Sequence, residues 1–105
     1  MTEIKFFADG NTVNGFSISG HSSFDCDDTQ GKLICSAISS AAYMTANTIT
    51  EIIGDKAKVE VRDGFMKVNV KNPSEKTVAV LLGFKLHIEQ LSLQYKDRIS
   101  ILSEV

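Results

Sequence analysis

Apolar and polar residues alternate along most of the first twenty positions, which is the period of half-buried β-strands. The first alternation covers residues 4–8 and the second covers residues 13–18. The segment between them, Ala-Asp-Gly-Asn, contains residues that favour tight turns. The pattern therefore predicts an N-terminal β-hairpin.

The next segment, residues 20–31, shows no apolar period. Gly20 and Gly31 stand at its two ends, and the acidic residues Asp25, Asp27 and Asp28 lie between them. We expect a loop here. Because connections of this length are often functional, the loop is also a candidate for contact with a substrate.

From about residue 33 to residue 53, apolar or small residues recur every three or four positions, which predicts an amphipathic helix. Its first three turns contain mostly Ser and Ala, so its backbone can lie close to a sheet. Gly54 follows the last apolar residue, and glycine in that place commonly ends a helix in the left-handed conformation.

A second hairpin is predicted around Asp63-Gly64, a residue pair typical of two-residue turns. The predicted register pairs Arg62 with Phe65, Val61 with Met66, Glu60 with Lys67, and Val59 with Val68. One face of the hairpin then carries Ala57, Val59, Val61, Met66, Val68 and Val70. We expect that face to lie on the core, with Glu60 and Lys67 as a favourable pair on the other face.

The last third of the chain predicts a helix and a short final strand. Ser74 is the expected N-cap, and the helix should continue to about Tyr95. Its expected buried stripe contains Val78, Leu81, Leu82, Leu86 or Lys85, Ile88 or Glu89, and Leu91. With a strand at residues 98–102, the order is ββαββα(β). This order predicts an α+β fold with a mostly antiparallel or mixed sheet packed against two helices.

Composition narrows the class of protein. The chain has 105 residues, of which 43% are hydrophobic and 23% charged, with a net charge of −2. These values fit one soluble domain over residues 1–105. Glu60 and Asp63 interrupt the cations of the second hairpin, which argues against direct nucleic-acid binding. No apolar run approaches the roughly 20 residues that span a bilayer, and the N-terminus lacks a signal-peptide layout. We expect no membrane contact and a cytoplasmic protein with reduced thiols.

Three residues with chemical potential, His21, Cys26 and Cys35, fall within fifteen consecutive positions. Cys35 is expected in the first turn of the first helix, where the dipole and unpaired N–H groups favour a thiolate and an oxyanion. His21 is expected at the end of the second strand, on the other side of the loop. A cysteine nucleophile with a histidine base is therefore one interpretation.

Other interpretations fit the same residues. A cysteine in an apolar run is commonly a small core residue, and His21 also suits a surface or capping role. A zinc site and a Cys26–Cys35 disulfide are further alternatives, but no CxxC or HxxxH spacing is present and the expected compartment is reducing. Ser39, one turn after Cys35, is either a hydrogen-bonding partner of the site or a small residue that allows close packing.

Two short motifs are the most specific parts of the sequence. One is the pair Gly20-His21, and the other is the run Leu33-Ile34-Cys35-Ser36-Ala37-Ile38-Ser39. In their order, separation and predicted placement, and together with both hairpins and the closing helix, they resemble the ribosomal-processing cysteine protease family Prp. The resemblance covers essentially the whole chain.

The resemblance implies an endopeptidase that removes the N-terminal extension of a large-subunit ribosomal protein, the one numbered twenty-seven. It implies Cys35 as the nucleophile and His21 as the general base, with no metal and no cofactor. It also implies a homodimer and a loop that orders over the substrate, with the residues Ser22, Ser23, Phe24 and Gly31.

One position departs from the family pattern. Family members usually carry an aspartate three residues before the cysteine, where this chain has Lys32. The aspartate would orient the histidine or hold the helix start, and lysine cannot accept a hydrogen bond. Asp25, Asp27 or Asp28 is a candidate replacement, and Lys32 would otherwise favour the thiolate through its charge.

A second functional hypothesis also remains: a non-catalytic dimeric module of the same fold that binds a ribosomal protein or the ribosome surface.

Overall fold

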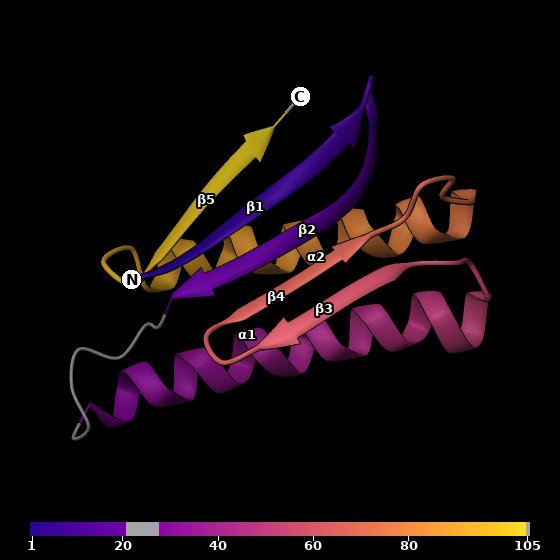
Figure 1. Cartoon of the computed structure of the whole chain (residues 1–105). Helices are drawn as coiled ribbons and strands as arrows, with labels where there is room; N and C mark the ends of the chain where they lie inside the picture. Colours follow the sequence, from indigo (N-terminus) through magenta and orange to yellow (C-terminus); the bar gives the residue numbers. More distant parts are fainter. Residues whose placement is uncertain (21–27, 105) are drawn as a thin grey trace.

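A five-stranded sheet and two long helices make up the described part of the chain, residues 1–20 and 28–104 of a computed structural model (Figure 1). In chain order the elements are β1 (Thr2–Asp9), β2 (Thr12–Gly20), α1 (Thr29–Asn47), the π-helical turn η1 (Thr48–Ile53), β3 (Lys58–Arg62), β4 (Phe65–Asn69), α2 (Glu75–Gln94) and β5 (Ile99–Glu104). The predicted α+β class, with a mixed sheet and a final strand, is confirmed.

The strands lie in the order β3-β4-β2-β1-β5. The hairpins β1–β2 and β3–β4 join through the antiparallel pair β2–β4, whereas β5 runs parallel to β1. Parallel strands need a crossover connection, and α2 lies on the path between β4 and β5. The start of β1, the end of β2, the β3–β4 turn and the start of α1 all lie at one end of the molecule (Figure 1).

One face of the sheet is apolar. Residues paired directly across strands share a face, and on this face the paired residues are hydrophobic. Two such rows cross the sheet: Ile101, Ile4, Ile18, Met66 and Val61, and then Phe6, Phe16, Val68 and Val59. α2 packs on this face through Phe84, whose ring centroid lies 4.5 Å from that of Phe16 and 5.9 Å from that of Phe6. Aromatic pairs of this kind add about 0.5–1.5 kcal/mol beyond the area that they bury.

The predicted register of the β3–β4 hairpin is confirmed in all four pairs. The predicted burial of its apolar face is confirmed for Met66, Val68 and Val70 on the β4 side. It is wrong for β3, where Val59 is 42% exposed and Val61 is 52% exposed. The reason is the place of β3 in the sheet: it is an edge strand, and the helices cover it only partly.

α1 begins at Thr29, about four residues earlier than the apolar period predicts. Asp28 is its N-cap, with a side-chain oxygen that accepts a hydrogen bond from the N–H of Gly31. The first turn contains no apolar residue, so the hydrophobic period could not reveal it. The predicted loop therefore ends earlier than expected, because Gly31 is a buried residue of α1.

The remaining helix signals are mostly confirmed. Ser74 caps α2, and Gly54 ends η1 with a φ of 87°. The predicted stripe of α2 is partly wrong, because Leu82 and Leu86 are exposed while Phe84 is buried. The leucines of α2 lie on more than one side of the helix, so the sequence does not indicate which side is buried. The sheet packs against the side that carries Phe84. In residues 1–20 and 28–104, no helix has both the length and the apolar character needed to cross a bilayer.

Asp55 joins the end of the first helical segment to the start of α2. Its Oδ2 accepts hydrogen bonds from Thr77 Oγ1 at 2.6 Å, from the Ser74 N–H at 2.8 Å and from Ser74 Oγ at 2.8 Å. These bonds, from the Thr77 hydroxyl first and then from Ser74, hold the pKa of Asp55 below its ordinary value because they favour the charged form.

The variant Asp55→Asn is expected to unfold at a lower temperature than the wild type at pH 7, because an amide oxygen accepts the same bonds without the charge. The folded pKa of Asp55 lies below the unfolded value of about 3.9. Its stabilisation is therefore present above that value and is lost as the pH falls through the folded pKa. Thermal unfolding followed by circular dichroism should show the difference in midpoint shrinking as the pH falls below about 4.

Asp63→Asn is the matched control. Asp63 lies exposed in the β3–β4 turn, where Asn-Gly suits the same turn geometry as Asp-Gly. Its midpoint at pH 7 should equal that of the wild type. A difference between wild type and Asp55→Asn that stays constant over the acid range would contradict the role given to the Asp55 charge.

Candidate active site

A cleft of about 150 Å³ opens where α1 faces the end of the sheet. Cys35 and Ser39 reach it from α1, Gly20 from the end of β2, and Gly64 from the β3–β4 turn. The rest of the lining is mostly apolar and consists of Thr2, Ile18, Ile38, Tyr43, Val61, Arg62, Phe65 and Met66. A strand end and a helix therefore meet at Cys35, as the sequence predicts.

Cys35 is half-buried in the wall of this cleft and is not a member of the buried core. The interpretation of Cys35 as a core-packing residue therefore does not describe its environment. The prediction that Cys35 lies in the first turn of its helix is wrong. α1 begins six residues earlier, at Thr29, so the residue sits about 9 Å further along the helix axis. Because the dipole effect falls off within the first turn, the amides at the helix start are not placed to stabilise charge on this sulfur.

Gly20 fixes the backbone at the end of β2, directly before His21. Its φ is 86°, and a Cβ at this position would lie 2.5 Å from the carbonyl oxygen of Met1. Its own N–H donates to the carbonyl oxygen of Gly64 at 3.0 Å. Only glycine meets both the positive φ and the close approach. The glycine of the Gly-His pair therefore serves to join β1, β2 and the β3–β4 turn at the cleft.

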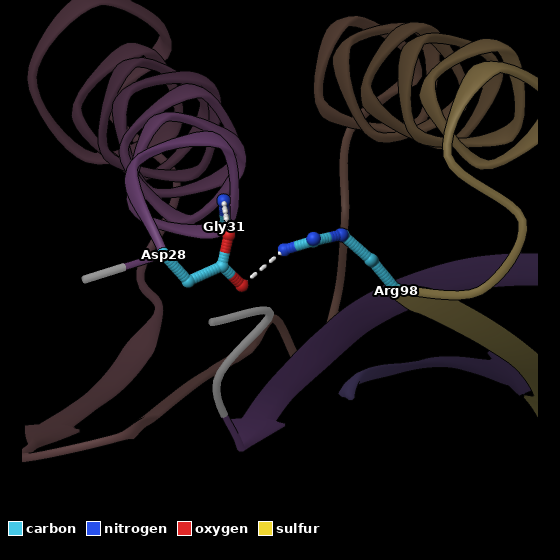
Figure 2. A network of polar contacts seen from close by, with 3 residues as sticks. All are labelled: Asp28, Gly31 and Arg98. Carbon is cyan, nitrogen blue, oxygen red and sulfur yellow. Dashed lines mark hydrogen bonds and ion pairs between the residues drawn. The ribbon is translucent and has the colours of Figure 1, made fainter. Parts of the chain in front are cut away.

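The carboxylate of Asp28 holds the start of α1 through both of its oxygens (Figure 2). Oδ1 accepts from the N–H of Gly31 at 3.0 Å, and Oδ2 accepts from Nη1 of Arg98 at 2.5 Å. The Asp28 and Arg98 side chains are 12% and 15% exposed, so the ion pair is largely shielded from water. Asp28 thus holds the start of α1, whereas its predicted role as a replacement for the family aspartate stays a prediction.

Lys32, at the position of that aspartate, is exposed in the first turn of α1. The other expected site residues lie outside the described residues, namely His21, Ser22, Ser23, Phe24, Asp25, Cys26 and Asp27. The zinc and disulfide alternatives both need residues of that group. Within the described ranges, no three His, Cys, Asp or Glu side chains are grouped so that they could hold a metal ion.

Several residues of the cleft are not singled out by the sequence analysis. Arg62 and Phe65 flank the turn pair of the second hairpin, so the predicted register places them together but does not indicate what they face. Tyr43 follows Ser39 by one helical turn, which puts the two on one side of α1. The Arg62 guanidinium lies 4.1 Å above the ring of Phe65. The cleft thus combines a largely apolar wall with one exposed cation.

Known proteins of one family are similar to this chain in sequence pattern and fold. The family model described as Cysteine protease Prp matches residues 1–100. No curated protein matches the chain. A crystal structure of an essential ribosomal processing protease Prp from Staphylococcus aureus, in complex with a covalently linked product peptide, has a TM-score of 0.85 at 15% identity and covers 99% of this chain and 100% of its own.

Two further crystal structures share the fold. The Staphylococcus aureus protease in complex with a substrate peptide has a TM-score of 0.87 at 12% identity, covering 99% of this chain and 100% of its own. A Streptococcus mutans protein has a TM-score of 0.84 at 17% identity, covering 99% and 96%. At these identities the structures establish the fold, whereas the family model, which spans nearly the whole chain, establishes the family. This chain belongs to the Prp family of cysteine proteases.

Proposed function

We propose that this cysteine protease removes the N-terminal extension of a large-subunit ribosomal protein, the one numbered twenty-seven, in the cytoplasm. The observation that carries the proposal is the cleft, in which Cys35 lines one wall and Gly20, bonded to His21, lines another. The similar Staphylococcus aureus structures are described as ribosomal processing proteases with bound peptides, which supports the class of substrate.

In the proposed reaction, His21 takes the proton of the Cys35 thiol and the thiolate attacks the carbonyl carbon of the scissile peptide bond. The C–N bond then breaks, and His21 returns the proton to the leaving amine. The product at this stage is a thioester between Cys35 and the extension. His21 next accepts a proton from water, whose oxygen attacks the thioester carbonyl and releases the extension as a carboxylic acid. The proton returns to the thiolate, and the dyad is restored.

The lining of the cleft indicates what kind of side chain lies beside the scissile bond. Ile18, Ile38 and Met66 form apolar wall, and the ring of Phe65 adds an aromatic surface. Apolar pockets with few polar groups favour apolar or aromatic side chains. We therefore expect the substrate to present such a side chain next to the bond that is cut.

Supporting roles are part of the proposal. Ser39 shares the cleft with Cys35 one turn away, where its hydroxyl suits a hydrogen-bonding role. Asp25, Asp27 and Asp28 are the candidates to orient His21, because each oxygen of the Asp28 carboxylate can accept more than the one bond that it makes at the helix start. Lys32 adds positive charge one turn before Cys35.

We also propose a homodimer. Leu82, Leu86 and Leu93 are exposed on α2 at spacings that place them on one side of the helix. An exposed apolar row of this kind is typical of a surface that meets another protein. Light scattering of the purified protein measures the oligomeric state directly.

The dyad predicts that Cys35→Ala and His21→Ala each lower the rate of cleavage by at least roughly 1,000-fold, since removal of one member of a catalytic unit removes its function. The substrate is the extended ribosomal protein named above, and the products are identified by mass spectrometry. Ser36→Ala is the control, because Ser36 is the exposed neighbour of Cys35 and does not line the cleft. It should cleave at the wild-type rate.

Absence of cleavage by the wild type, together with slow alkylation of Cys35 by iodoacetamide at pH 6, would contradict the proposal. The non-catalytic module that binds a ribosomal protein or the ribosome surface would then be the better interpretation.

Gly20→Ala is expected to abolish most of the cleavage, because the added Cβ must displace the backbone of Met1 or Gly20 itself beside the cleft. Gly10→Ala is the matched control. Gly10 also has a positive φ, of 64°, but a Cβ there meets nothing within 4 Å. Both variants carry the strain of about 1–2 kcal/mol for a left-handed alanine, whereas only Gly20→Ala adds the clash. Equal cleavage rates in the two variants, measured well below their unfolding midpoints, would refute the role of Gly20.

A further inference from the structure

Arg98 connects two segments that border the cleft. Its Nη1 donates to Oδ2 of Asp28 at 2.5 Å, and its carbonyl oxygen accepts from the N–H of Thr2 at 2.9 Å. Thr2 begins β1 and lines the cleft, while Asp28 caps the helix that carries Cys35. A single residue, from the turn before β5, thus touches both the strand side and the helix side of the site.

The contact to the helix is tied to the cap. Asp28 uses Oδ1 for the N–H of Gly31 and Oδ2 for Arg98, so a shift of the helix start weakens both bonds together (Figure 2). The two side chains are mostly shielded from water. In such surroundings a charged hydrogen bond is stronger and less screened by salt than on an open surface. The pair therefore restrains the direction from which α1 approaches the sheet.

Cys35 follows Asp28 by seven residues, which is two helical turns. The two residues therefore lie on the same side of α1, about 10 Å apart along its axis. A helix is stiff over two turns, so a tilt or rotation at Asp28 moves Cys35 with it. The place of the thiol within the cleft thus depends on a contact made two turns away.

We propose that the Asp28–Arg98 ion pair is a positioning element of the protease, which sets the orientation of α1 and hence the place of Cys35 in the cleft. The proposal rests on the proposed function, because it assumes that Cys35 is the nucleophile. The ion pair lies at the start of α1, two helical turns before Cys35. The effect of the pair reaches the reaction through the helix, and a misplacement of about 1 Å in a catalytic group can cost about 100-fold in rate.

The test compares Asp28→Asn and Arg98→Met with the wild type. Asparagine is as good an N-cap as aspartate, so Asp28→Asn keeps the helix start and removes the ion pair. Both variants are expected to lower kcat at least about tenfold and to change KM less than about twofold, since positioning acts on the chemical step and not on peptide binding. The double variant should lose less kcat than the product of the two single losses, because the two single variants remove the same ion pair.

Lys96→Met is the matched control, since Lys96 is an exposed cation of the same turn. It should keep the wild-type kcat. Circular dichroism must show that each variant is folded at the assay temperature, well below its unfolding midpoint. The rate of Cys35 alkylation by iodoacetamide at pH 6, mapped by mass spectrometry, gives a second measurement that needs no substrate. It should fall in Asp28→Asn and Arg98→Met but not in Lys96→Met.

The outcomes separate the two proposals. If the wild type cleaves and the folded ion-pair variants keep its kcat and its alkylation rate, the positioning role is overturned while the proposed function stands. A loss of kcat that Lys96→Met shares would overturn it as well. If the wild type neither cleaves nor reacts rapidly at Cys35, both proposals are overturned.

Discussion

The start of α1, the helix that carries Cys35, depends on one carboxylate. Asp28 begins α1 by capping Gly31 and fixes its direction through Arg98. Because Arg98 also bonds the start of β1 through its backbone, the helix and the sheet are connected at the end of the molecule where the cleft opens. The apolar core holds the sheet and the helices together, but hydrophobic contacts are not directional and do not fix the angle of a helix. The Asp28–Arg98 contact is directional and restrains the orientation of α1.

The sheet also brings several of its strand ends to the cleft. β1 starts, β2 ends and the β3–β4 turn closes at one end of the sheet, as the antiparallel order of these strands demands. Gly20 lets three pieces of backbone approach closely there. The end of β2, directly before His21 in the sequence, is therefore fixed at the cleft. Cys35 on the helix and Gly20 on the sheet are thus held at this end by contacts made outside the Cys35 side chain.

The sequence predicts the fold class and the hairpin register because strand period and the Asp63-Gly64 turn are local signals. It predicts that the end of β2 lies beside the helix that carries Cys35, although not the turn of α1 in which Cys35 lies. That error has a clear cause: the first turn, Thr-Gln-Gly-Lys, carries no apolar residue, and the cap is completed by Arg98, 70 residues away. The exposure of Val59 and Val61 is also not predictable from the sequence pattern, because the edge position of β3 follows from the order of the strands and not from the pattern of one strand.

The central claim is that Cys35 becomes covalently attached to the substrate during the reaction. The direct measurement mixes the wild-type protein with the extended ribosomal protein, stops the reaction in acid within its first turnover, and determines the intact mass and the modified peptide. The expected result is an adduct equal to the extension less one water, located on the peptide that contains Cys35. An adduct on another residue, or complete cleavage with no adduct at any time and undiminished activity of Cys35→Ala, would contradict the claim.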